Sequence, residues 1–209
     1  MARSPAGNRY TYDPQNGSRY AQAYALYFNI PKEKRIFFYD ADGNDCSNFI
    51  SQCIWAAYGG WIPSTDDAAV AQNKQRMKEY VREVAGVWYG SDTFSGPPNW
   101  CRVEGIFSYV TSKKAVGPSG EKVAEGTWEN IDPGIIQKGD IVQLVVSGYA
   151  SYRYGHSLYV TKQGATFDDI LICCHSYDRL NAPLSSFSLY PEAYKKLRVL
   201  RLKDAVFAK

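Results

Sequence analysis

The stretch DCSNFISQCIWAAYGG, residues 45–60, decides how this chain of 209 residues folds. Its apolar residues recur at positions 46, 49, 50, 53, 54 and 57, which is the spacing of one face of an α-helix. Asp45 is a residue type that starts helices, and the pair Gly59 and Gly60 is of the type that ends them. The pattern predicts a helix with one buried face and with Cys46 in its first turn.

The first turn of a helix suits a reactive cysteine. Free backbone N–H groups and the positive end of the helix dipole stabilise a thiolate there, whereas a free thiol has a pKa near ~8.5. The charge of Asp45 opposes this effect unless its carboxylate caps the helix. The position also fits a small buried residue, so Cys46 becomes a candidate nucleophile only together with a base.

The chain has only two histidines, and both stand at the ends of predicted strands. His156 opens the strand 156–161, and His175 closes the strand 170–174. A cysteine nucleophile needs a base for its proton and a polar group that orients the base. Cys46, His156 and His175 fit these roles in that order, although a lone histidine in a strand is more often structural. We expect His156 at the rim of the sheet face that the Cys46 helix covers.

The second half of the chain is rich in β-branched residues and in turns. Helices are expected around the Cys46 stretch and at 19–28, about 64–84 and 102–112, and strands at 141–146, 156–161, 170–174 and 197–202. No helix separates the strands, which favours antiparallel pairing. Helices first and a sheet second predict an α+β fold, in which N-terminal helices pack on a C-terminal antiparallel sheet.

Composition excludes several classes of function. The net charge of +3, without a run of Lys or Arg, argues against nucleic acid as a partner. No stretch approaches the ~20 apolar residues of a membrane span. The five cysteines show no metal-ligand spacing, and Cys173 and Cys174 point to opposite faces of a strand, so we expect no metal and no cofactor.

Residues 9–209 are predicted to form one domain, because no repeat, low-complexity tract or linker interrupts them. Residues 1–8 resemble a junction segment without the apolar core of a signal peptide. We expect an extracellular or cell-surface domain given without its signal peptide, with a cytoplasmic location left open, and a monomer. The helix at about 64–86 is an insertion that either forms a wall of the site or packs on the surface.

The motifs resemble the putative amidase domain family of bacteria, a branch of the papain-like cysteine peptidases related to NlpC-type and CHAP domains. The family block Asp-Cys-Thr-Asn-Phe-Val-Ser-Gln matches residues 45–52, and its Gly-His-Ser matches residues 155–157. In the same order the chain shows a Tyr/Ala-rich first helix, a Trp-Tyr pair, a Gly-Asp before a strand and a later His-Ser, at residues 20–25, 88–89, 139–140 and 175–176. The chain lacks the family's Ser before Trp100, and its 64–86 helix is long for that position.

The resemblance implies a papain-like fold and a Cys-His-His triad. In that triad Cys46 is the nucleophile, His156 is the base and His175 orients the base. Asp178 and Asn181 follow closely in the sequence and are alternative orienters.

The remaining site residues are assigned from chemistry that such a triad needs. The backbone N–H of Cys46 is the expected oxyanion donor, because N–H groups at a helix start are unpaired, and Tyr39 is a candidate second donor. A groove lined by Trp88, Tyr89 and Trp100 would suit a sugar or an apolar side chain, although the same aromatic residues suit a core.

The function expected from these features is a cysteine amidase or peptidase that acts through an acyl-thioester. Related families imply bacterial cell-wall peptides, that is, a peptide or peptidoglycan-type substrate. Two alternatives stay open. An acyltransferase or transamidase would use the same chemistry with an amine in place of water, and a non-catalytic module would bind a glycan or peptide on the same fold.

Overall fold

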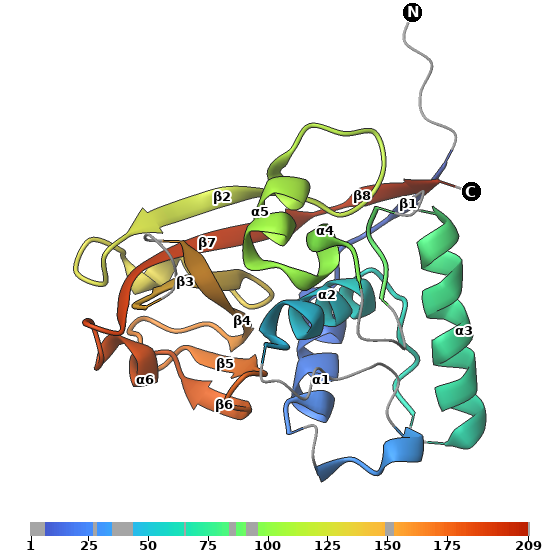
Figure 1. Cartoon of the computed structure of the whole chain (residues 1–209), viewed down its shortest axis with the longest axis horizontal. Coiled ribbons are helices and arrows are strands. Elements are labelled where there is room, and N and C mark those ends of the chain that lie inside the picture. Colours follow the sequence, from blue (N-terminus) through green and yellow to red (C-terminus); the bar gives the residue numbers. More distant parts are fainter. Residues whose placement is uncertain are drawn as a thin grey trace, which may run out of the picture.

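The structure is a computed structural model, and it describes residues 7–26, 29–34, 44–64, 66–83, 87–90, 96–148 and 153–208. Helices lie mainly in the first half of the chain and strands in the second half (Figure 1). The helices pack against an antiparallel sheet of six strands. The predicted α+β fold is confirmed at this level.

The described helices are α1 (Pro14–Tyr24), η2 (Lys32–Lys34), α2 (Cys46–Ala57), α3 (Asp67–Glu83), α4 (Pro98–Cys101), α5 (Val103–Thr111), η3 (Pro133–Ile135) and α6 (Ser185–Ser188). The helices predicted around residue 50, at 64–84 and at 102–112 are confirmed as α2, α3 and α5. Helix α1 begins earlier than predicted, because the Asp13 side chain accepts the Gln15 N–H and Pro14 suits the first turn.

The strands are β1 (Gly7–Tyr10), β2 (Ser119–Gly126), β3 (Ile141–Val146), β4 (Tyr154–Lys162), β5 (Leu171–Cys174), β6 (Arg179–Pro183), β7 (Tyr194–Lys203) and β8 (Ala205–Ala208). The main sheet has the order β2-β7-β3-β4-β5-β6 with every neighbouring pair antiparallel, and β1 pairs with β8 separately. The predicted strands are confirmed as β3, β4, β5 and β7. Strand β1 includes Gly7 and Asn8, which the sequence analysis had assigned to the junction segment.

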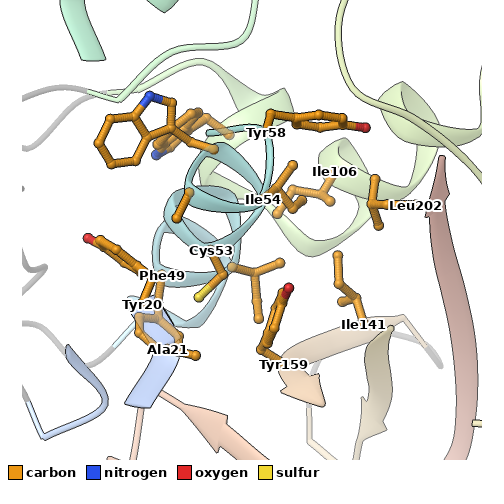
Figure 2. Close-up of a cluster of buried hydrophobic side chains, with 14 of the residues drawn as sticks. Tyr20, Ala21, Phe49, Cys53, Ile54, Tyr58, Ile106, Ile141, Tyr159 and Leu202 are labelled. Carbon is orange, nitrogen blue, oxygen red and sulfur yellow. The ribbon is translucent and has the colours of Figure 1, made fainter. Parts of the chain in front are cut away.

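Helix α2 lies at the centre of the molecule. Every residue of α2 except Asn48 is buried, and α1, α4, α5, β4 and β5 all pack against it. Figure 2 shows Phe49, Cys53 and Ile54 of this helix within the core. Burial of apolar area stabilises the folded state by roughly 25 cal/mol per Å². A helix that is apolar on nearly all sides is therefore most stable in the interior of the protein.

The two faces of the main sheet carry two separate hydrophobic clusters. Ile141, Tyr159 and Cys173 belong to the cluster that contains α2, whereas alternate residues such as Val142 and Leu158 belong to the other. This division follows from the alternation of side chains along a strand. It therefore decides which strand residues can face the helix that carries Cys46.

Helix α3 packs against β8 and lies along one margin of the molecule (Figure 1). No helix in the described ranges is long and apolar enough to cross a membrane. None of the five cysteines, all of which fall within these ranges, forms a disulfide.

Candidate active site

A cavity of about 1020 Å³ opens beside the first turn of α2. Its walls come from the start of α2, the α4–α5 segment, the start of β4 and the turn that follows β5. Cys46 and His156 both line this cavity, together with Ser176. The fold thus brings the predicted nucleophile and the predicted base to one cavity, although they are far apart in the sequence.

The Cys46 thiol is buried, with 5% of the residue exposed. The backbone N–H of Ser157 donates a hydrogen bond to the sulfur, and the Ser47 hydroxyl lies 3.9 Å from it. Burial raises the pKa of the Cys46 thiol, and the charge of Asp45 raises it further, whereas hydrogen bonds from Ser157 and Ser47 lower it less than burial raises it. At neutral pH Cys46 is therefore a thiol and not a thiolate.

His156 lies on the sheet face opposite to the one predicted. It shares a face with Leu158 and Val160, as expected, but these residues belong to the cluster on the far side of the sheet from α2. Its ring contacts that of Phe187, with 5.6 Å between centroids. The thiol of Cys46 meets β4 at the peptide group between His156 and Ser157, which explains how both residues reach the same cavity.

The His156 imidazole is neutral at neutral pH. Burial lowers its pKa to about 4, and the nearby positive charge of Arg179 acts in the same direction. Within the described part of the chain no hydrogen bond holds the ring, and none links it to Asp178 or to Asn181. Asn181 instead accepts hydrogen bonds from Thr161 and Gln22.

His175 does not orient His156, which corrects the assignment made from the resemblance. Its Nδ1 lies 2.6 Å from Oδ2 of Asp45, and its Nε2 lies 2.8 Å from the carbonyl oxygen of Tyr24. The ring also stacks on Phe49, with centroids 4.0 Å apart. Both ring nitrogens are engaged, so neither can hold the base.

The contacts of His175 show where its protons are. A carbonyl oxygen only accepts, so Nε2 carries a proton toward Tyr24, and the contact between Nδ1 and the Asp45 carboxylate requires a second proton between them. Both side chains are 1% exposed. This buried pair joins the end of α1, the start of α2 and the end of β5.

Asp45 does not cap α2 through its side chain, contrary to expectation. Its carboxylate binds His175 and accepts a hydrogen bond of 2.8 Å from the Asn48 side chain. The start of α2 is capped instead by Ser176, whose Oγ accepts the N–H groups of Asp45 at 3.0 Å and of Cys46 at 3.2 Å. The backbone N–H predicted as the oxyanion donor is therefore occupied, and the second candidate, Tyr39, lies outside the described residues.

The aromatic groove predicted from the sequence is not formed. Trp88 and Trp100 are each 1% exposed and pack against each other in the main core, with ring centroids 4.6 Å apart. Trp100 also donates a hydrogen bond of 2.7 Å to Asn48. Tyr89 is half-buried and is not among the residues that line the cavity. The core interpretation is correct for the two tryptophans.

Several cavity residues were missed by the sequence analysis. The walls carry the exposed side chains of Arg102, Arg153 and Tyr177, of which Tyr177 is 87% exposed. Glu104 also lines the cavity and pairs with Arg198 at 3.0 Å. No local sequence pattern marks these residues as part of a site, because their segments meet only in the folded chain. Ser176 is the one cavity residue that the sequence could have indicated, because it is a polar residue directly after His175.

Comparison with known proteins identifies one family. The sequence pattern of the family described as putative amidase domain matches residues 11–198. This range runs from the start of α1 into β7 and includes Cys46, His156 and His175. A search among curated proteins and a search among solved structures gave no match.

Proposed function

Because this chain belongs to the putative amidase domain family, we propose that it is a papain-like cysteine amidase or peptidase in which Cys46 is the nucleophile. One observation carries the proposal: Cys46 at the start of a buried helix and His156 at the start of a strand line one cavity. A pure binding module would need neither a thiol nor an imidazole there.

The first half of the reaction forms an acyl-thioester. His156 takes the thiol proton as the sulfur bonds to the amide carbon and the carbonyl electron pair moves to oxygen. The C–N bond then breaks as the carbonyl re-forms, and His156 returns the proton to the leaving amine. Since both groups start neutral, proton transfer accompanies the attack and no thiolate has to exist beforehand.

The second half returns the enzyme to its starting state. A water molecule gives a proton to His156 as its oxygen bonds to the thioester carbon. The C–S bond breaks, the sulfur regains the proton, and a carboxylic acid leaves. An amine in place of water would make an amide by the same steps, so transamidation is the second candidate activity.

In this proposal His175 is a positioning residue. It binds Asp45, and Asp45 immediately precedes Cys46, so the buried pair fixes the first turn of α2. The site is a Cys46–His156 dyad, with the Asp45–His175 pair holding the nucleophile helix in place.

Bacterial cell-wall peptides are the substrate class that we propose. Arg102 and Arg153 are exposed and line the cavity, and a guanidinium group binds carboxylates in a two-pronged geometry. Cell-wall stem peptides carry free carboxylates, so these arginines suit them. Such a substrate places the enzyme outside the cytoplasm or at the cell surface.

A peptidoglycan digest tests this function. Wild-type protein is expected to release fragments that mass spectrometry identifies as products of amide hydrolysis, and Cys46→Ala should release none while remaining folded. Cys53→Ala is the matched control, because Cys53 lies in the core (Figure 2) and its loss should spare the chemistry. Equal release by wild type and Cys46→Ala would refute the cysteine mechanism, and products that carry an added amine would establish transamidation.

A further inference from the structure

Two backbone N–H groups at the start of α2 converge on one hydroxyl. The oxygen of Ser176 accepts from Asp45 at 3.0 Å and from Cys46 at 3.2 Å. A serine oxygen has two lone pairs and one proton. With both lone pairs in use, the Ser176 hydroxyl can make a further hydrogen bond only as a donor.

The proton of this hydroxyl is available to a molecule in the cavity. Ser176 is half-buried and lines the cavity together with Cys46 and His156. In the described ranges of the chain no group accepts a hydrogen bond from it. The two N–H groups lie at the positive end of α2, and they polarise the hydroxyl so that it donates more strongly.

The backbone holds Ser176 in an unfavourable conformation. Ser176 and Tyr177 have φ values of 62° and 73°, in the turn between β5 and β6. Hairpin turns with positive φ usually contain Asn, Asp or Gly, and other residues are strained there. The preceding His175 is anchored on Asp45 and Tyr24, so tertiary contacts impose the position of the hydroxyl.

We propose that Ser176 is a catalytic residue whose hydroxyl stabilises the oxyanion of the reaction. This proposal rests on the function proposed for Cys46. When the sulfur bonds to the carbonyl carbon, the carbonyl electron pair moves to the oxygen, and the Ser176 O–H donates a hydrogen bond to that oxygen while keeping its proton. The start of α2 then acts on the substrate through Ser176, which accounts for the occupied N–H of Cys46.

A role in capping alone would have different consequences. A cap supports the helix and so affects the stability of the fold. An oxyanion donor affects only reactions that pass through a tetrahedral centre. Two reactions of the same thiol separate these roles, because acylation by an ester builds an oxyanion and alkylation by iodoacetamide does not.

The experiment measures both reactions at Cys46 in wild type and Ser176→Ala. The probes are p-nitrophenyl acetate, followed by the burst of p-nitrophenolate with the Cys46→Ala background subtracted, and iodoacetamide, followed by the mass of the Cys46 peptide. Ser176→Ala should slow acylation by about 10²–10³-fold, the usual effect of losing one oxyanion donor, and leave alkylation at the wild-type rate. The matched control is Ser64→Ala, which removes a hydroxyl that accepts the Asp66 N–H before α3, and it should change neither rate.

Each other outcome overturns the proposal. Equal slowing of acylation and alkylation would show that Ser176 acts on the thiol itself. An unchanged rate of acylation would show that Ser176 only caps the start of α2. If Ser176→Ala does not fold, Ser176→Gly suits the positive φ and also lacks the hydroxyl, so the same selective loss is expected there. A wild-type protein whose Cys46 reacts with neither probe would overturn the proposed function together with this proposal.

Discussion

Cys46 and His156 illustrate how burial reverses an expectation based on helix position. The start of a helix lowers the pKa of a thiol when its N–H groups are free, but at α2 Ser176 accepts the N–H groups of Asp45 and Cys46. Burial then dominates and raises the pKa of the Cys46 thiol. The same cause lowers the pKa of the His156 imidazole, so the two groups start as a neutral pair.

The pH dependence of the rate follows from the state of His156. Its pKa of about 4 keeps the imidazole neutral and able to accept a proton well below neutral pH. The acidic limb of kcat/KM for p-nitrophenyl acetate should therefore lie near pH 4, and His156→Gln should abolish the activity. An acidic limb near pH 6.5, where an unperturbed histidine titrates, would contradict the neutral pair.

At the scale of elements, the position of α2 depends on contacts at both of its ends. At its start, the Asp45–His175 pair links it to α1 and β5. At its end, the Arg76 guanidinium of α3 donates a hydrogen bond of 2.8 Å to the carbonyl of Gly60. Only the first contact lies beside the cavity, because none of the cavity-lining residues is an α3 residue whose side chain the structure describes, that is, up to Arg76. Of the two alternatives for the 64–86 helix, a wall of the site or a packed surface helix, these residues favour the second.

This arrangement predicts the effect of His175→Ala. The change leaves the buried Asp45 carboxylate without its His175 partner, and breaking a buried pair in this way typically costs about 3–5 kcal/mol. Thermal unfolding should therefore move to a much lower temperature, whereas kcat should fall less than it does in His156→Gln. The double variant Asp45→Asn with His175→Gln removes both charges and should recover part of the stability. Full stability with abolished kcat would instead support a triad.

Arg76→Ala serves as the control for that experiment, because it loosens the far end of the same helix. Losing the hydrogen bonds from Arg76 to the carbonyl oxygens of Gly59 and Gly60 should cost about 1–2 kcal/mol of stability and leave the burst with p-nitrophenyl acetate unchanged. A loss of activity in this variant would show that any loosening of α2 disturbs the site.

At the scale of the whole molecule, the main sheet separates two cores, and His156 stands where the far-side core meets the cavity. Its ring is therefore buried against Phe187, and protonation of the ring changes the stability of the whole fold. Below pH 6.5 the unfolded chain binds a proton at His156 that the folded chain takes up only near pH 4.

Stability should therefore fall as pH drops from 6.5 to 4 and lose no more from this residue below that range. The contribution of His156 to this loss is about 3 kcal/mol, from the difference between the two pKa values. Urea unfolding of wild type and His156→Gln across this range measures it, since other titrating groups are common to both. Parallel curves for the two proteins would show that His156 is not desolvated in the folded state.

The sequence by itself determined the periodic elements and indicated Cys46 and His156 as the candidate nucleophile and base. The repeat of apolar residues in 45–60 predicted α2, and the β-branched runs predicted β3, β4, β5 and β7, because both signals depend on near neighbours. The weakly patterned strands β1, β2, β6 and β8 were not predicted. The order of the motifs identified the family, which the match over residues 11–198 confirms.

Only the tertiary structure decided which groups act on one another. His175 and Asp45 are separated by 130 residues, as are Ser176 and Cys46. No local sequence pattern predicts hydrogen bonds between residues so far apart in the chain. Whether His156 shares a sheet face with α2 depends on which side of β4 that helix covers. Whether Trp88 and Trp100 are buried or line a groove depends on how the core packs around them. Hydrogen-bond partners and burial are properties of packed surfaces, so they exist only once distant segments are brought together.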